Sequence, residues 1–220
     1  MRFEISPLIS HISYLTSHVY SIPLGMKLNQ IVVFCASSPG FDGTFVRAAE
    51  EVGRVFVERG ITLVYGGGRV GLMGAVADAV MDNGGRVIGV IPQFLNSKEI
   101  GHSEITQLIE VDTMHERKAK MNALCDAVIA MPGGFGTMEE LFEMTTWGQL
   151  GLHKKPIGIL NVDGFYDYLI AFIQHMVDTG LLKEENQRMI MYSDKIEDLL
   201  EQMEAYEAPP VPKWLNLEKS

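Results

Sequence analysis

The sequence has few cysteines, and their spacing excludes two kinds of site. Only Cys35 and Cys125 occur in 220 residues, 90 positions apart and without the paired spacing of a zinc site. We therefore expect no disulfide framework and no bound metal, in a reduced, cytoplasmic protein. Cys35 ends an apolar run, which favours a small buried side chain over a nucleophile.

The chain also lacks basic clusters and long apolar runs. It has 28 acidic and 18 basic residues, a formal net charge of -10, whereas nucleic-acid binding depends mainly on clustered Lys and Arg. No stretch approaches the roughly 18 consecutive apolar residues of a membrane span. We expect no nucleic-acid partner and no membrane partner, and an anionic ligand would depend on helix dipoles and a few cations.

The amino-terminal segment makes a poor signal peptide, because Arg2 is its only early positive charge and Glu4 follows. Met26 opens MKLNQIVVFCASS, which reads as the start of a first strand. We predict that residues 1–25 are an extension outside the fold, with a helix lying on a membrane as the weaker alternative. Residues 26–207 are predicted to form one domain, followed by a Pro-rich tail at 208–220.

From residue 30 onward, short β-branched runs alternate with longer amphipathic stretches, as in IVVFCA, TFVRAAEEVGRVFVERG and ITLVYGGG. This alternation predicts an α/β fold: a single-domain, Rossmann-like, doubly wound parallel sheet with helices on both faces. Ligands bind such sheets outside the carboxyl ends of the strands. We therefore expect four loops to share one rim, at residues 36–40, 66–71, 92–101 and 132–137.

The stretch GGGRVGLMG satisfies G-x-G-x-x-G at Gly66, Gly68 and Gly71, between a predicted strand and a predicted helix. A dinucleotide site usually has an acidic residue at the end of the next strand, to hold the ribose. Here that strand ends in Ile91 and Pro92 and has no carboxylate at its end, which argues against an NAD site. Two interpretations stay open: a tight turn packed against its neighbour, or a loop that contacts a mononucleotide.

The stretch PGGFGT is the stronger signal for a ligand. Gly133, Gly134 and Gly136 allow the backbone to approach an anion, and Thr137 offers a hydroxyl where a helix begins. The stretch lacks the G-K-[ST] ending of a P-loop, which disfavours hydrolysis of a nucleoside triphosphate. One phosphate fits this loop better than three.

Carboxylates follow this loop directly, and they have an ordinary explanation. Thr137 and Glu140 form T-x-x-E, a capping box in which the glutamate binds backbone donors at the helix start. The same pattern opens the helix in TMHERK, where Arg117 and Lys118 follow one turn later as two cations near the rim. Ordinary surface charge is the alternative for both.

Together, MHERK and PGGFGTMEE, with Arg117 and Glu140 separated by 23 positions, resemble the Lonely Guy family of cytokinin-activating phosphoribohydrolases. Members of this family have often carried the label lysine decarboxylase. The resemblance runs from about residue 27 to about residue 206 and includes YGGGRVGLMG, GVIP and TTWGQLG. It implies hydrolysis of the N-glycosidic bond of adenosine 5′-monophosphates, often N6-substituted, to free base and ribose 5-phosphate, without a cofactor.

The resemblance also implies roles for particular residues. The catalytic pair would be Arg117 and Glu140. The phosphate would be held by Gly133, Gly134, Gly136 and Thr137. The nucleotide would be contacted by Glu99, Lys118 and Thr146, and Met114 would lie near the base. Two features depart from the family pattern: Phe135 stands where Tyr is common, and NSKEIGH replaces the usual Pro-Arg-Glu loop while retaining Glu99.

The chemistry accounts for an acidic residue beside a phosphate. Cleavage of the C1′–N9 bond builds positive charge on the ribose, and a carboxylate can stabilise this charge or activate the attacking water. Arg117 would offset negative charge on the departing base or on the phosphate. The capping and catalytic roles of Glu140 compete for one carboxylate.

Two other functions are alternatives for this sequence. A pyridoxal-phosphate decarboxylase would need a Schiff-base lysine and a longer chain, and no lysine here is marked for that role. A non-catalytic nucleotide-binding or carrier protein on the same fold is the main alternative to an enzyme. The apolar helix LFEMTTWGQLG, with Trp147, further predicts a homodimer, in line with the family.

Overall fold

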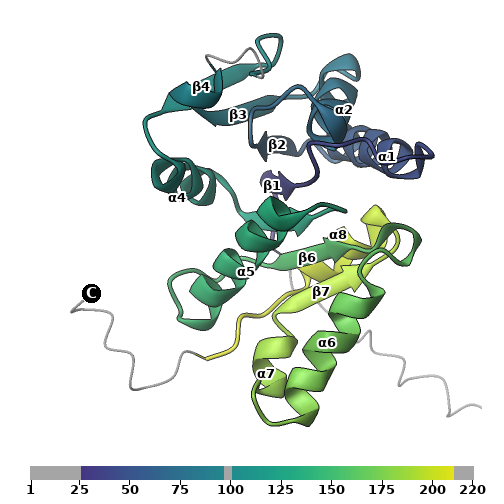
Figure 1. Cartoon of the computed structure of the whole chain (residues 1–220), viewed down its shortest axis with the longest axis vertical. Coiled ribbons are helices and arrows are strands. Elements are labelled where there is room, and N and C mark those ends of the chain that lie inside the picture. The colour runs from purple at the N-terminus through teal and green to yellow at the C-terminus, as the bar shows by residue number, and fades with distance from the viewer. Residues whose placement is uncertain (1–25, 97–100, 211–220) are drawn as a thin grey trace, which may run out of the picture.

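Seven parallel strands form the centre of the fold. The computed structural model describes residues 26–96 and 101–210. The strand order is β4-β3-β2-β1-β5-β6-β7, and each neighbouring pair is parallel (Figure 1). The strands are β1 (Gln30–Phe34), β2 (Thr62–Tyr65), β3 (Val87–Pro92), β4 (Gln107–Val111), β5 (Ala127–Ala130), β6 (Ile157–Leu160) and β7 (Ile190–Ser193). The predicted fold class is confirmed.

Helices connect these strands and cover both faces of the sheet. The longer helices are α1 (Thr44–Glu58), α2 (Gly71–Asp82), α4 (Met114–Leu124), α5 (Phe135–Gln149), α6 (Asp167–Asp178) and α8 (Ile196–Glu204). The short ones are α3 (Gln93–Asn96), η1 (Val162–Gly164) and α7 (Glu184–Gln187). Figure 1 shows α1, α2 and α8 on one face and α4 and α5 on the other. Within the described ranges, no helix is long and apolar enough to cross a membrane.

The side chains of β1 divide between two apolar cores. Ile31 and Val33 pack with α1, α2 and α8, whereas Val32 and Phe34 pack with α4 and α5. Successive strand residues point to opposite faces, so a sheet that is covered on both faces needs apolar residues at every position. This requirement explains why the strand sequences are continuous apolar runs.

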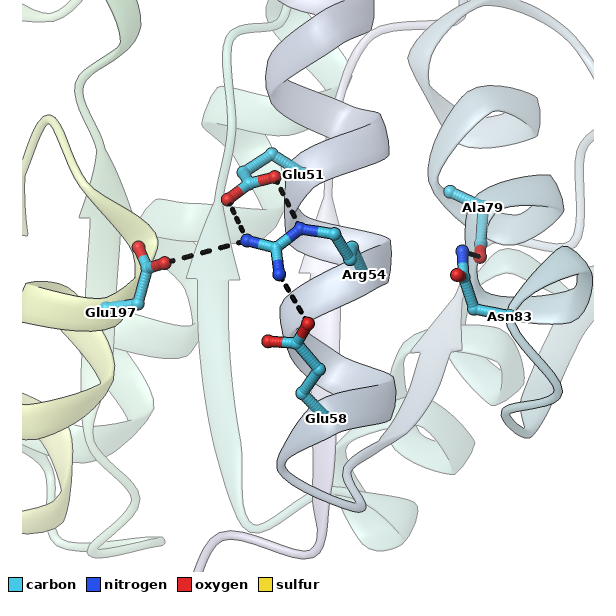
Figure 2. Close-up of polar contacts among 6 residues, drawn as sticks. All are labelled: Glu51, Arg54, Glu58, Ala79, Asn83 and Glu197. Carbon is cyan, nitrogen blue, oxygen red and sulfur yellow. Dashed lines mark hydrogen bonds and ion pairs between the residues drawn. The ribbon is translucent and has the colours of Figure 1, made fainter.

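Ion pairs join α1 to α8 on the surface. Arg54 of α1 pairs with Glu58 on its own helix and lies 3.9 Å from Glu197 of α8 (Figure 2). At the end of α2, Asn83 Nδ2 donates a hydrogen bond to the carbonyl oxygen of Ala79 at 2.7 Å (Figure 2). The charged side chains are about half exposed, so these pairs contribute little to stability.

Four of the described elements were not predicted from the sequence: the edge strand β7 and the short elements α3, η1 and α7. The edge strand β7 lies in a segment for which no strand was predicted, because its methionines and half-buried pattern give a weak strand signal and it pairs only with β6. The predicted loop at residues 92–101 contains α3, a single turn too short to show helical periodicity. The predicted extension at 1–25 and most of the predicted tail lie outside the described residues, so the domain boundaries stay predictions.

Candidate functional site

A cavity of about 360 Å³ lies at the carboxyl ends of β1 and β5. The chain leaves β1 toward β2 on one side and returns to β5 on the other, so this is the topological switch point of the sheet. The lining residues come from the loops that follow β1 and β5 and from α2, α4 and α5: Cys35, Ala36, Ser37, Ser38, Met73, Arg117, Gly134, Phe135, Gly136, Thr137 and Glu140. The volume is typical of a site for a small molecule.

Two of the four loops predicted to share a rim line this cavity, those at 36–40 and 132–137. The loop at 66–71 contributes no lining residue among those described, although it packs directly behind the cavity. The loop at 92–101 falls partly outside the described residues, and its last residue, Gly101, pairs with Gly68. The predicted rim is therefore confirmed for the loops after β1 and β5.

Two glycines of GGGRVGLMG lie close to their neighbours, and the packing is strictest at Gly71, whose neighbour is backbone rather than the end of the Arg117 side chain. A Cβ on Gly66 would lie 2.0 Å from Arg117 Nη2, and a Cβ on Gly71 would lie 2.2 Å from the carbonyl carbon of Ser37. Gly71 also has a φ of +61°, where a side chain is strained. Of the two interpretations left open for this motif, the structure supports the tight turn packed against its neighbours.

The glycine loop after β5 forms one wall of the cavity. A Cβ on Gly134 or Gly136 would meet no atom within 4 Å, so both glycines face open space. Gly133 acts differently, because its missing Cβ makes room for the Thr137 side chain, whose Oγ1 would lie 2.1 Å away. Thr137 is buried and lines the cavity. The wall thus presents backbone and one hydroxyl to a ligand.

The predicted capping box at the start of α5 is wrong. The helix begins at Phe135, with Gly134 as its N-cap and no side chain that caps it. Thr137 is therefore already the third helical residue, and Glu140 lies too far along the helix to cap its start. With no side-chain cap, the N–H groups of the first turn are available to an anion.

Helix α4 positions the cation of the site. Its predicted capping box is confirmed, since the Thr113 hydroxyl accepts a hydrogen bond from Glu116 N at 3.1 Å. One turn later, Arg117 Nε donates to the Val90 carbonyl oxygen at 3.1 Å and Nη2 donates to that of Gly66 at 3.3 Å. These bonds hold the guanidinium over the carboxyl ends of β2 and β3.

Arg117 faces Glu140 across the cavity floor. Arg117 Nη1 lies 3.5 Å from Glu140 Oε1, and each side chain is only 12% exposed. Burial raises the pKa of Glu140 to about 7; Arg117 and Lys118 oppose this rise, whereas the charges of Glu139 and Glu143 add to it. A carboxyl group that exchanges its proton near neutral pH is suited to acid–base chemistry.

Lys118 lies beside the cavity and joins α4 to α5. Its Nζ donates to Glu139 Oε1 at 2.6 Å and to Glu143 Oε1 at 2.9 Å. The hydrogen bond to Glu139 is the main cause that raises the pKa of Lys118 above its ordinary value. Lys118 therefore neutralises the two carboxylates that flank Glu140, and its implied contact with a nucleotide stays a prediction.

Two of the other implied contact residues, Met114 and Thr146, do not line the cavity. Met114 is 39% exposed and lies outside the lining. Thr146 is exposed, and its Oγ1 donates to the carbonyl oxygen of Phe142 within its own helix at 2.7 Å. Glu99 lies outside the described residues. The roles implied for these three residues stay predictions.

Six lining residues were not predicted as site residues, although the loop at 36–40 was predicted to lie on the rim: Cys35, Ala36, Ser37, Ser38, Met73 and Phe135. The two serines carried a usable signal, because they directly follow a strand at the switch point. Cys35 is buried as predicted; burial raises the pKa of its thiol well above the usual range, and the charge of Glu140 adds to the rise. No group of three or more His, Cys, Asp and Glu side chains in the described ranges is arranged to hold a metal ion.

Comparisons with known proteins identify the family of this chain. Residues 73–203 match the model of a family described as "Possible lysine decarboxylase". The chain is 49% identical over 187 residues to cytokinin riboside 5′-monophosphate phosphoribohydrolase LOG2 of Arabidopsis thaliana, covering 85% of this chain and 86% of that protein. It is 48% identical over 180 residues to cytokinin riboside 5′-monophosphate phosphoribohydrolase LOG of Oryza sativa subsp. japonica, covering 82% of this chain and 74% of that protein.

A solved structure also shares the fold. The molybdenum cofactor binding protein from Rippkaea orientalis aligns with a TM-score of 0.63 over 82% of this chain and 98% of that chain. The two sequences are 20% identical, so this likeness concerns the fold alone.

Proposed function

Because the chain belongs to the Lonely Guy family of cytokinin riboside 5′-monophosphate phosphoribohydrolases, we propose that it hydrolyses the N-glycosidic bond of adenosine 5′-monophosphate or its N6-substituted forms. The products are the free base and ribose 5-phosphate. The observation that carries this proposal is the buried Arg117–Glu140 pair, 3.5 Å apart, in a cavity whose wall is the glycine loop.

The glycine loop is the proposed phosphate site. Gly134 and Gly136 leave the backbone accessible, and Thr137 adds a hydroxyl at the uncapped start of α5. The helix dipole favours an anion at this end. A phosphate held there puts the attached ribose next to Glu140, which follows Thr137 by about one helical turn.

Glu140 is the proposed base. It takes a proton from a water molecule, whose oxygen forms the new bond to C1′ while the C1′–N9 bond breaks. N9 leaves with the electron pair and takes up a proton from solvent, and Glu140 releases its proton to solvent. The carboxylate also stabilises the positive charge that develops on the ribose. Arg117 offsets negative charge on the departing base or on the phosphate.

Product analysis tests this function and identifies the base. Purified protein is incubated with AMP and with N6-isopentenyl-AMP, and free base and ribose 5-phosphate are followed by chromatography. Release of both products from either nucleotide supports the proposal, and the ratio of kcat/KM values names the preferred substrate. Nucleotide that is bound and recovered intact would instead support the alternative, a non-catalytic nucleotide-binding or carrier protein. The molybdenum cofactor binding protein shares only its fold with this chain.

The pH dependence of kcat/KM should follow Glu140. Its pKa of about 7 predicts a rate that rises with pH and levels off above that value, because the ionised carboxylate activates water. Replacing Lys118 with Met should shift this rise to higher pH, because the Lys118 charge lowers the pKa of Glu140. Initial rates at saturating and low substrate across pH 5 to 9 are the measurement. A rate that rises toward acid would contradict the role as base.

We further propose a cytoplasmic homodimer that contacts its second copy through the carboxyl half of α5 and the residues after it. Phe142 is 38% exposed and Leu152 is 54% exposed, whereas Trp147 packs against the core. Light scattering at micromolar concentration should give twice the chain mass of 24.4 kDa. Replacing Phe142 with Arg should shift the mass toward the monomer. A monomeric unaltered protein would disprove the dimer.

A further inference from the structure

Tyr166 is a buried tyrosine whose hydroxyl reaches the backbone just ahead of the glycine loop. The residue is only 2% exposed and does not line the cavity. Its hydroxyl donates a hydrogen bond to the Met131 carbonyl oxygen at 2.7 Å, and Pro132 follows as the first residue of the loop. Burial raises the pKa of the Tyr166 phenol well above its ordinary value, and Cys35 adds to the rise. The hydroxyl therefore keeps its proton and holds the loop from behind.

This hydrogen bond replaces one that the sheet does not make. β1 and β5 are paired in register as far as Phe34, whose carbonyl oxygen accepts from Met131 N at 2.9 Å. In a regular parallel ladder, Ala36 N would then donate to the Met131 carbonyl oxygen. It donates instead to that of Pro132, one residue further on, at 3.1 Å. The chain thus leaves the ladder at Met131, and Tyr166 pairs the carbonyl group that the ladder releases.

Tyr166 is itself held in place by the loop that follows β6. Tyr166 N donates to Asn161 Oδ1 at 2.7 Å, and Asn161 Nδ2 donates to Asp167 Oδ1 at 2.8 Å. The Tyr166 ring meets the Phe165 ring edge to face, with the centroids 4.9 Å apart. Asn161 directly follows β6, so one strand fixes the point where its neighbour β5 ends.

The position of the Met131 carbonyl group decides where the first turn of α5 begins. Two residues separate Met131 from Gly134, the N-cap of α5. Because this link is so short, a shift at Met131 is passed on to the N–H groups that start the helix. Further along α5, Leu141 and Met144 are buried in the core. They hold Glu140 in place through packing rather than through this hydrogen bond.

We propose that Tyr166 is a positioning residue for the phosphate: its hydroxyl fixes the end of β5 so that the glycine loop and the start of α5 fit a phosphate group. This inference rests on the proposed function, which puts the phosphate at the start of α5. The hydrogen bond should therefore control the binding of phosphate and leave the chemical step at Glu140 nearly unchanged.

The test is Tyr166→Phe, which keeps the ring and removes the hydroxyl. KM for AMP and the inhibition constant of inorganic phosphate should each rise about 3- to 10-fold, the effect of one lost hydrogen bond, while kcat changes less than about 2-fold. A loss confined to kcat, or an unchanged inhibition constant, would overturn the proposal. If Tyr166→Phe does not fold, Asn161→Ala removes the acceptor of Tyr166 N and should raise the same two constants; unchanged constants would count against the proposal.

The matched control is Tyr65→Phe, at the end of β2. Tyr65 is also fully buried, but its hydroxyl has no hydrogen-bond partner among the residues that the structure describes. This variant should therefore keep the parental kcat, KM and inhibition constant. An equal rise of KM in both variants would show that the loss of any buried hydroxyl has this effect, and the positioning role would be disproved.

A binding measurement separates this inference from the proposed function. If the unaltered protein releases no base from AMP, the proposed function fails. The affinities of inorganic phosphate and of adenosine, measured by calorimetry on the parent and on Tyr166→Phe, then decide the role of Tyr166. Weaker binding of phosphate with unchanged binding of adenosine supports it. Equal losses for both ligands, or no change for phosphate, disprove it.

Discussion

Replacing Glu140 with Gln should lower kcat for AMP hydrolysis by about 10²- to 10⁴-fold, the usual contribution of a positioned base. Glutamine keeps the shape of the side chain but can neither take a proton from water nor supply negative charge to the ribose. KM should change little, because the phosphate is held by the loop at the start of α5. Steady-state rates with purified enzyme, followed by release of free base, are the measurement.

The matched control for this variant is Glu143→Gln, one turn further along α5. Glu143 binds Lys118 and does not line the cavity, so this variant should keep at least about a tenth of the activity. A loss as large as that of Glu140→Gln would show that both substitutions act through the general charge of α5. Full activity in Glu140→Gln would exclude Glu140 as the base.

Glu140 should also leave a signature in the stability of the protein. Burial raises its pKa from 4.5 to about 7, so between these values the folded state holds a proton that the unfolded state releases. The contribution of Glu140 to stability is therefore most favourable below pH about 4.5 and declines as the pH rises to about 7. Urea titrations of the parent and of Glu140→Gln should show this decline in the parent alone.

Replacing Arg117 with Met should lower kcat/KM by about 10²- to 10³-fold, the typical cost of losing one electrostatic stabiliser of a transition state. The substitution also removes the donors to the Val90 and Gly66 carbonyl oxygens and the cation beside Glu140. Leaving buried polar groups unpaired should reduce the free energy of unfolding by about 1 to 3 kcal/mol. Enzyme kinetics and urea unfolding measure the two effects separately.

Arg117→Lys is the matched control, because it keeps the charge but cannot reach two carbonyl oxygens and a carboxylate with one ammonium group. Its activity should lie between those of the parent and Arg117→Met. In the Met variant, the rise of rate with pH should also shift upward, since the Arg117 charge lowers the pKa of Glu140. An Arg117→Met enzyme with parental kcat/KM would exclude Arg117 from catalysis.

Part of the fold was predictable because its signals are local. The β-branched runs of β1, β2 and β3 and the helical stretches between them follow from side-chain periodicity within a few residues. The edge strand β7 was missed, because a half-buried strand with a single neighbour carries little periodic signal. Helix α3 is one turn long and has no periodicity to detect.

The candidate site was predictable only where a short sequence motif indicates the kind of ligand by itself. The glycine loop PGGFGT indicated a phosphate site from its glycines and the helix that follows. The same reasoning misassigned Glu140, because T-x-x-E is a capping box only if the helix begins at the threonine, and α5 begins at Phe135. In GGGRVGLMG, Gly66 and Gly71 are present for close packing against Arg117 and Ser37, which no local pattern reveals.

The sequence by itself determined the alternation of strands and helices and the glycine loop after β5, because these depend on short-range spacing. The Arg117–Glu140 pair was implied only by the resemblance to the family. Only the tertiary structure decided that α4 and α5 bring this pair to 3.5 Å, that burial raises the pKa of Glu140 to about 7 and that two serines after β1 line the same cavity as the glycine loop. Burial and the proximity of charges arise from packing between elements distant in the chain, and short-range spacing carries no record of it.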